Sequence, residues 1–289
     1  MTKKKNITFG IGIIIFCILA ACFYFFDLEI SKSMASDNPN FMFVLLAAIG
    51  EFPIYIGSIL FGLIYGFTSE SKNTKLMSHF VGIIGLYIAF IRLTKGIFNE
   101  FFSSNIWILQ YILLAIVALI VYVLMFMVFN KIDNEKLYKI RDIALIYFIV
   151  SISSFLIVTL MKNIWGRPRY RILDGNYEAY SNFLTIHGFK NSKLGDNYRS
   201  FPSGHTNAAS SILVLSLITP RFTNKKWVKY LITGICIVYP VLVAISRICV
   251  GAHYASDVLF GFGVSFTCLL TTYIIFKKKG WLYVRSNKC

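Results

Sequence analysis

The chain has 289 residues, of which 57% are hydrophobic and only 15% are charged, whereas a soluble globular protein carries about a quarter charged residues. This composition argues against a soluble protein and favours an integral membrane protein in contact with membrane lipids. The formal net charge of +16 does not indicate a nucleic-acid partner, because the basic residues lie in short segments between apolar runs and not in an arm interleaved with aromatic residues.

The first apolar run, at about residues 9–26, predicts a transmembrane helix. Lys3–Lys5 precede it, and Leu19–Cys22 are similar to the lipidation site of a bacterial lipoprotein signal. However, Phe23–Phe26 continue the apolar run where a mature lipoprotein normally turns polar. We therefore expect an uncleaved signal anchor, and the sequence leaves open whether Cys22 is lipidated.

Further apolar runs follow, so the predicted fold class is an all-α integral membrane protein with about eight transmembrane helices. Several of the runs approach or exceed the roughly 20 residues that a helix needs to cross a bilayer. The predicted spans lie at about residues 9–26, 41–67, 79–98, 105–129, 143–165, 205–219, 228–246 and 254–276.

Charges within the predicted spans are few, and Glu51, Arg92 and Lys95 stand out among them. Charged side chains at such depth usually pair with one another or face a polar cavity. All three lie toward the predicted outer ends of their helices, so they could equally extend to the membrane interface. The sequence leaves both interpretations open.

The polar connections between the spans alternate between strongly basic segments and segments with few basic residues. Residues 27–40 and 99–104 contain only Lys32 as a basic residue. Because cytoplasmic loops are enriched in Lys and Arg, we predict that both termini are cytoplasmic and that these two connections lie outside. The loop 166–204 carries six basic residues on the predicted outer face. Either this topology is wrong or the charges serve an anionic ligand. We favour the ligand, because the other loops agree with the topology and structureless loops of this length are usually functional.

Lys162 and Arg169 lie where the fifth predicted span ends. Gly166 and Pro168 are expected to stop the helix, which leaves Lys162 one turn inside the span and Arg169 just outside it. Basic residues at the end of a transmembrane helix are more often interfacial anchors. This pair alone therefore does not indicate catalysis.

The segment Pro202–His205 precedes the sixth predicted span. Ser203 is a plausible helix N-cap, and the free N–H groups of a first helical turn form an anion site. Gly204 allows an oxyanion to approach the backbone closely. His205 would lie in the first turn, directed at the bound anion.

Arg247, His253 and Asp257 surround the start of the eighth predicted span. His253 and Asp257 are four residues apart, which places them on one face of a helix. An aspartate that accepts a hydrogen bond from one imidazole nitrogen leaves the other nitrogen free to act as a nucleophile. We expect Asp257 to be the one carboxylate of the site and to be committed to His253, so the sequence predicts no metal site.

Together these motifs resemble the signature of the type 2 phosphatidic acid phosphatase superfamily: Lys-x6-Arg-Pro, then Pro-Ser-Gly-His, then Ser-Arg-x5-His-x3-Asp. The second and third motifs are complete at Pro202–His205 and at Ser246–Asp257. The first motif matches at Lys162 and Arg169, but Tyr170 replaces its closing proline. Proline offers no catalytic group, so we expect this departure to alter loop geometry and not chemistry.

The resemblance implies a domain organisation. Residues 79–289 would form a six-helix phosphatase core made of spans three to eight, with the active-site loop 166–204 on its outer face. Residues 1–78 would be an N-terminal addition of two spans.

The resemblance also implies a role for each motif residue. His253 would attack phosphorus and become phosphohistidine, Asp257 would stabilise its positive charge, and His205 would protonate the leaving oxygen. No metal ion or other cofactor is implied. The residues that would bind the phosphoryl oxygens of the substrate are Lys162, Arg169, Ser203, Gly204 and Arg247.

The predicted function is therefore hydrolysis of a lipid phosphomonoester or diphosphate at the cell membrane. Candidate substrates are undecaprenyl diphosphate, phosphatidylglycerophosphate and phosphatidic acid, and the sequence does not choose among them. A lipid phosphotransferase with the same intermediate is an alternative. A non-enzymatic transporter or lipid-binding protein is disfavoured, because the polar residues gather at one membrane face. The oligomeric state is not predicted.

Overall fold

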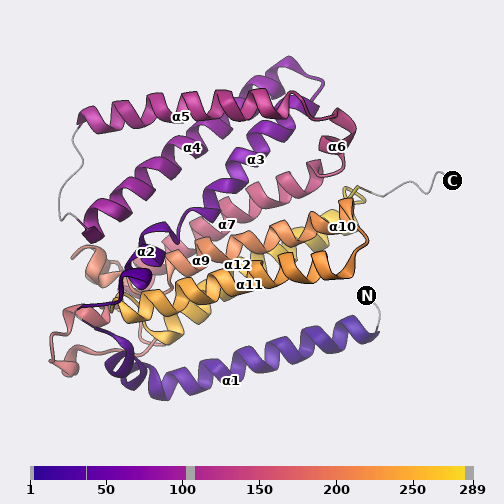
Figure 1. The fold of residues 1–289 in the computed structure, drawn as a ribbon. Coiled ribbons are helices and arrows are strands. Elements are labelled where there is room, and N and C mark those ends of the chain that lie inside the picture. Colours follow the sequence, from indigo (N-terminus) through magenta and orange to yellow (C-terminus); the bar gives the residue numbers. More distant parts are fainter. Residues whose placement is uncertain (1–2, 37, 102–107, 284–289) are drawn as a thin grey trace.

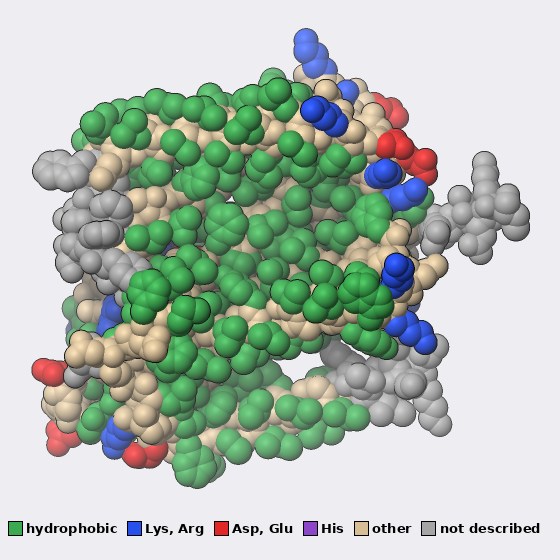
Figure 2. Space-filling model, viewed as in Figure 1, with side chains coloured by type: hydrophobic (Ala, Val, Ile, Leu, Met, Phe, Trp, Pro, Cys, Tyr) green, Lys and Arg blue, Asp and Glu red, His purple; other side chains and the backbone are tan. Residues whose placement is uncertain are grey.

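The computed structural model describes residues 3–36, 38–101 and 108–283, and this part of the chain is helical without strands. The long helices run back and forth between the two ends of a bundle (Figure 1). Apolar side chains cover the middle of the bundle, and charged side chains gather at its two ends (Figure 2). Within the described residues, seven helices are long and apolar enough to cross a membrane. The predicted all-α membrane fold class is confirmed.

The N-terminal half of the described chain consists of helices that overlap the first four predicted spans. Helix α1 runs without a break through Cys22. The second predicted span is divided, because the chain turns at residues 50–52 before Pro53 begins the next helix. The elements are α1 (Lys3–Met34), α2 (Phe41–Ile49), α3 (Pro53–Thr68), α4 (Lys72–Phe101) and α5 (Ile108–Phe129).

The C-terminal half contains three long helices joined by shorter helical segments. The long helices are α7 (Arg141–Trp165), α11 (Lys226–Cys249) and α12 (Ala255–Lys278). The shorter α-helices are α6 (Asn134–Tyr138), α8 (Gly188–Ser192), α9 (Gly204–Ser210) and α10 (Thr219–Phe222). The 3-10 segments are η1 (Tyr170–Ile172), η2 (Tyr177–Ala179), η3 (Asp196–Tyr198) and η4 (Ser211–Leu217).

The sixth predicted span is helical but is not one α-helix, because α9, η4 and α10 follow one another along it. Near the junction of α9 and η4, the Ser210 hydroxyl donates to the Thr206 carbonyl at 2.6 Å and the Ser211 hydroxyl donates to the Ala208 carbonyl at 2.7 Å. Such bonds compete with the regular helix ladder. The predicted number of eight spans is therefore not confirmed.

Helix α7 is the central element of the bundle. It packs against α3, α8, α9 and α12, and Ile146, Tyr147 and Val150 on it are completely buried. At one end of the bundle, α7 meets α9, α12 and the long loop that follows α7, and α11 packs against α9 and α12 (Figure 1). All three sequence motifs lie at this end.

Candidate active site

The end of α7 positions Lys162 and Arg169. Gly166 takes a left-handed conformation with φ 57°, and its N–H donates to the Lys162 carbonyl, which ends the helix as predicted. The Lys162 ammonium donates to the Arg199 carbonyl at 2.5 Å. An Arg169 Nη2 atom lies 2.7 Å from Asp196 Oδ2. Both basic side chains line a cavity of about 630 Å³.

The turn that begins α9 lies beside this cavity. Ser203 is the N-cap of α9, since its hydroxyl oxygen accepts from the Thr206 N–H at 3.3 Å. A Cβ atom on Gly261 of α12 would overlap the Ser203 carbonyl oxygen, so glycine allows α12 to pack against this turn. Gly204 and His205 line the cavity, whereas Ser203 is completely buried behind it.

Asp257 has more partners than the sequence predicted. Its Oδ1 accepts from Arg167 Nη1 at 2.6 Å, and its Oδ2 accepts from the Tyr254 N–H at 3.0 Å and from the Ser200 hydroxyl. His253 Nδ1 lies 3.5 Å from Oδ2, at the outer limit of a hydrogen bond. Asp257 therefore faces His253 as expected, but it is shared with Arg167, which the sequence did not predict.

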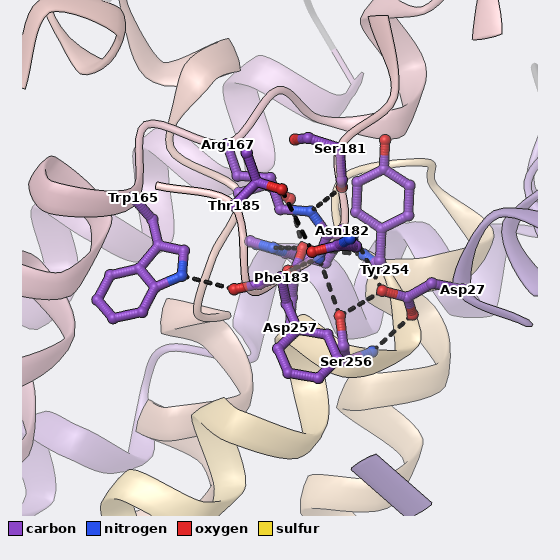
Figure 3. Close-up of polar contacts among 12 residues, drawn as sticks. Asp27, Trp165, Arg167, Ser181, Asn182, Phe183, Thr185, Tyr254, Ser256 and Asp257 are labelled. Atoms are coloured by element: carbon purple, nitrogen blue, oxygen red, sulfur yellow. Dashed lines mark hydrogen bonds and ion pairs between the residues drawn. The ribbon is translucent and has the colours of Figure 1, made fainter. Parts of the chain in front are cut away.

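Arg167 lies in a buried network that extends from Asp257 to the N-terminal helix (Figure 3). Its Nη2 donates to Asp27 Oδ2 of α1 at 3.0 Å, and its Nε donates to the Ser181 carbonyl at 2.9 Å. Asp27 also accepts from the Ser256 N–H at 2.8 Å. The arginine and both aspartates are each 0% exposed. Buried charges of this kind are tolerated only when they are paired, which explains why one arginine lies between two carboxylates.

A second carboxylate faces the other histidine. Glu51 lies in the turn between α2 and α3, and its Oε1 is 3.3 Å from His205 Nδ1. Arg92 of α4 contacts Glu51 Oε2 through Nε at 2.9 Å and Nη2 at 2.8 Å. Glu51 and Asp196 both line the cavity, so the expectation of a single carboxylate in the site is wrong.

The structure brings together most of the residues that the sequence predicted for the site. Those that line the cavity are Lys162, Arg169, Gly204, His205, Arg247 and His253. Ser203 and Asp257 lie directly behind them, and the intramembrane charges Glu51, Arg92 and Lys95 line the cavity as well. The rest of the wall includes apolar side chains of α2, α3 and α7: Ala47, Ala48, Ile54, Phe155 and Val158.

His253 lies in the connection between α11 and α12 and is almost completely buried. Burial lowers the pKa of its imidazole well below the ordinary value, and the positive charges of Lys162 and Arg169 lower it further, against the opposing effect of Asp257. The neutral imidazole is therefore the resting form at neutral pH. This is the form with a free nitrogen lone pair.

Residues 143–281 match the model of the PAP2 superfamily. These residues, called the PAP2 segment below, are similar to that superfamily. The PAP2 segment contains every residue that the sequence predicted for the site, and the predicted resemblance to the type 2 phosphatidic acid phosphatases is confirmed.

The chain is also similar to the lipid A 4'-phosphatase of Porphyromonas gingivalis. The two proteins are 25% identical over 166 residues, which cover 57% of this chain and 60% of that protein. No solved structure matches the chain.

The charged pairs of the site include Asp27, Glu51 and Arg92, which lie outside the PAP2 segment. The sequence pattern singled out Glu51 and Arg92 as charges within predicted spans but gave them no role. It placed Asp27 only in a connecting segment. The pairs that these residues form join positions far apart in the chain, such as Asp27 and Arg167, and no local spacing indicates them.

Proposed function

We propose that this chain is a membrane phosphatase that hydrolyses a phosphomonoester or diphosphate of a lipid through a phosphohistidine intermediate. One observation carries the proposal. A single cavity is lined by two histidines, His205 and His253, and by three basic side chains that suit a phosphoryl group: Lys162, Arg169 and Arg247.

The basic residues stabilise the charge that develops on the phosphoryl oxygens. Charge-assisted donors fixed in a partly closed site stabilise such a transition state because they do not have to reorganise during the reaction. The backbone of Gly204 is in the cavity wall and adds an N–H donor. Ser203 caps the same turn and keeps this backbone in place, so its contribution to phosphoryl binding is indirect.

In the first step, the lone pair of His253 Nε2 attacks phosphorus. The bond between phosphorus and the leaving oxygen breaks, and that oxygen takes a proton from the imidazolium of His205. The products are the free lipid alcohol or lipid monophosphate, phosphorylated His253 and neutral His205. Asp257 stabilises the positive charge on phosphorylated His253, and Arg167 fixes the orientation of this carboxylate.

In the second step, water releases the phosphate. Neutral His205 accepts a proton from the water as the water oxygen attacks phosphorus. The bond between phosphorus and His253 Nε2 breaks, and its electron pair returns to the imidazole. Inorganic phosphate leaves, and His205 is again protonated for the next cycle.

The shape of the cavity supports a lipid substrate. Phe155 lies seven residues before Lys162 on α7, which corresponds to about 10 Å along the helix. The cavity therefore extends from the basic residues toward the apolar middle of the bundle, where a lipid tail is stable. The name of the lipid A 4'-phosphatase relative supports a phosphorylated lipid as the substrate. The candidates undecaprenyl diphosphate, phosphatidylglycerophosphate and phosphatidic acid are all of this class.

We also propose that the chemistry proceeds without a metal ion, because Lys162, Arg169 and Arg247 supply the positive charge that a cation would otherwise provide. The distribution of basic residues among the loops supports a cell-membrane location with cytoplasmic termini and an outward-facing site.

Phosphate release by the purified full-length protein in detergent tests the proposed function. We expect release from at least one member of a panel of lipid phosphates and lipid diphosphates. Turnover limited to soluble sugar phosphates would contradict the lipid substrate. Transfer of the phosphoryl group to an added alcohol without phosphate release would identify a phosphotransferase. No turnover of any panel member would overturn the proposed function.

A further inference from the structure

Glu51 occupies an unusual position for a carboxylate in a predicted membrane span. It lies in the turn that divides α2 from α3, at the end of the bundle that holds the sequence motifs. Its side chain lines the cavity and is 19% exposed. Neither the PAP2 segment nor the sequence motifs include it.

The two oxygens of Glu51 have different partners. Arg92 contacts Oε2 through Nε and Nη2, and Oε1 lies 3.3 Å from His205 Nδ1. The arginine therefore fixes which oxygen of the carboxylate faces the histidine. Because Nδ1 faces Glu51, Nε2 is the His205 nitrogen left to face a substrate.

We propose that Glu51 is a positioning residue for His205 in the phosphoryl transfer proposed above, with Arg92 holding it in place. The inference rests on that proposed function. Glu51 accepts a hydrogen bond from Nδ1–H of the His205 imidazolium, which presents Nε2–H to the leaving oxygen. It also stabilises the imidazolium against the positive charges of Lys162, Arg169 and Arg247, which line the same cavity.

The site then contains two parallel chains of an arginine, a carboxylate and a histidine. The first chain runs from Arg167 through Asp257 to His253, as described above. The second chain runs from Arg92 through Glu51 to His205. In each chain the arginine fixes a carboxylate and the carboxylate faces a histidine nitrogen, so each histidine has its own acceptor.

A purely structural role of the Glu51–Arg92 pair is a less adequate explanation. The Arg92 side chain is 48% exposed, and ion pairs that are this accessible contribute little to stability. A structural pair also has no need of a histidine, yet Oε1 is directed at His205 and away from Arg92.

The leaving group of the substrate shows whether Glu51 acts through the general acid His205 or has only a structural role. We compare an alkyl phosphate with an aryl phosphate that carries an equivalent apolar tail and a strongly acidic phenol. An alkyl leaving group needs a proton as the bond to phosphorus breaks, whereas the aryl leaving group departs as the anion. The quantity measured is kcat/KM, which reports the steps up to phosphorylation of His253.

For Glu51→Gln we expect kcat/KM to fall on the order of ten- to hundredfold with the alkyl phosphate, because the loss is bounded by what a general acid contributes. With the aryl phosphate we expect little change. Glu135→Gln is the matched control, since Glu135 pairs with Lys139 at 2.8 Å on α6, away from the site (Figure 1). This control should leave both values unchanged.

Equal losses for both substrates, or no loss for either, would overturn the role of Glu51. Should Glu51→Gln fail to fold, Arg92→Gln supports the same comparison, and it must show the same selective loss with the alkyl phosphate. A wild-type protein that cleaves neither substrate nor any lipid phosphate would instead reject the proposed function. The two failures are therefore distinguishable.

Discussion

The guanidinium of Arg167 and the carboxylate of Asp257 form a fully buried ion pair, with Nη1 and Oδ1 2.6 Å apart. The sequence suggested that Asp257 serves His253 directly. Arg167 binds Oδ1 of this carboxylate, whereas His253 faces Oδ2. Arg167 therefore fixes the orientation in which Asp257 faces His253. The same guanidinium reaches Asp27 of α1 at 3.0 Å, so the ion pair also links the first helix to the site.

Replacement of Arg167 by leucine is expected to destabilise the fold strongly. The change leaves Asp27 and Asp257 buried without their shared cation, and breaking a buried pair typically costs about 3–5 kcal/mol. The thermal unfolding midpoint of the purified protein in detergent measures this effect. The matched control is Lys139→Ala at the C-cap of α6, which breaks an accessible pair with Glu135 and should change the midpoint little. An unchanged midpoint for Arg167→Leu would contradict the role of the buried pair.

Replacement of His253 by alanine is expected to abolish phosphate release and covalent labelling by a radioactive lipid phosphate. The label on the wild-type protein should be lost in acid and retained in alkali, as expected of a phosphohistidine. His187→Ala is the matched control, because this histidine is exposed and lies outside the cavity lining. Retained labelling in His253→Ala would sink the assignment of the nucleophile.

The protonation of His253 should be observable directly. Burial, reinforced by Lys162 and Arg169, lowers the pKa of its imidazole. Since a lowered pKa means that the proton binds only at a lower pH, His253 should stay neutral as the pH falls through about 6.5, the ordinary value for histidine. NMR titration of histidine-labelled protein, with the resonance assigned from His253→Ala, measures this. A midpoint at or above the ordinary value would show that the imidazole is not held neutral.

Phosphate release is expected to survive a chelator. The positive charge in the cavity comes from side chains, including Lys162 and Arg247, and these remain when free metal ions are removed. Turnover measured with and without excess chelator tests this. Loss of turnover that magnesium restores would overturn the metal-free mechanism.

The direction of the site across the membrane can be tested with a single cysteine in the loop that follows α7. Lys193 is exposed and suits this purpose, whereas the side chain of neighbouring Asn191 donates to the Gly166 carbonyl at 2.6 Å. We expect an impermeant thiol reagent to label Lys193→Cys in intact cells, with the unsubstituted protein as the background. Labelling only after lysis would place the loop in the cytoplasm.

Local sequence signals predicted the parts of the site that depend on helix ends. Gly166 ends α7 and Ser203 caps α9 because these residue types suit those backbone positions. The four-residue spacing of His253 and Asp257 likewise brings their side chains together at the start of α12. Such features depend on a few neighbouring residues, so a single sequence carries them.

The sequence did not predict which charges would pair across the bundle. Asp27, Glu51 and Arg92 were visible as polar residues in an apolar chain, but their partners are set by how the helices pack. The division of the sixth span was also missed, because the serines that bond to the helix backbone there look like ordinary small residues in an apolar run.

The contact of Asp27 with Arg167 has a consequence for how far this protein can be trimmed. A shortened protein of residues 79–289 would keep every motif residue and the whole PAP2 segment. It would lack Asp27 and Glu51 together, which would leave Arg167 with one carboxylate and His205 without its acceptor. The smallest unit that retains the complete arrangement of charges therefore begins within α1 and is much larger than the segment that defines the family.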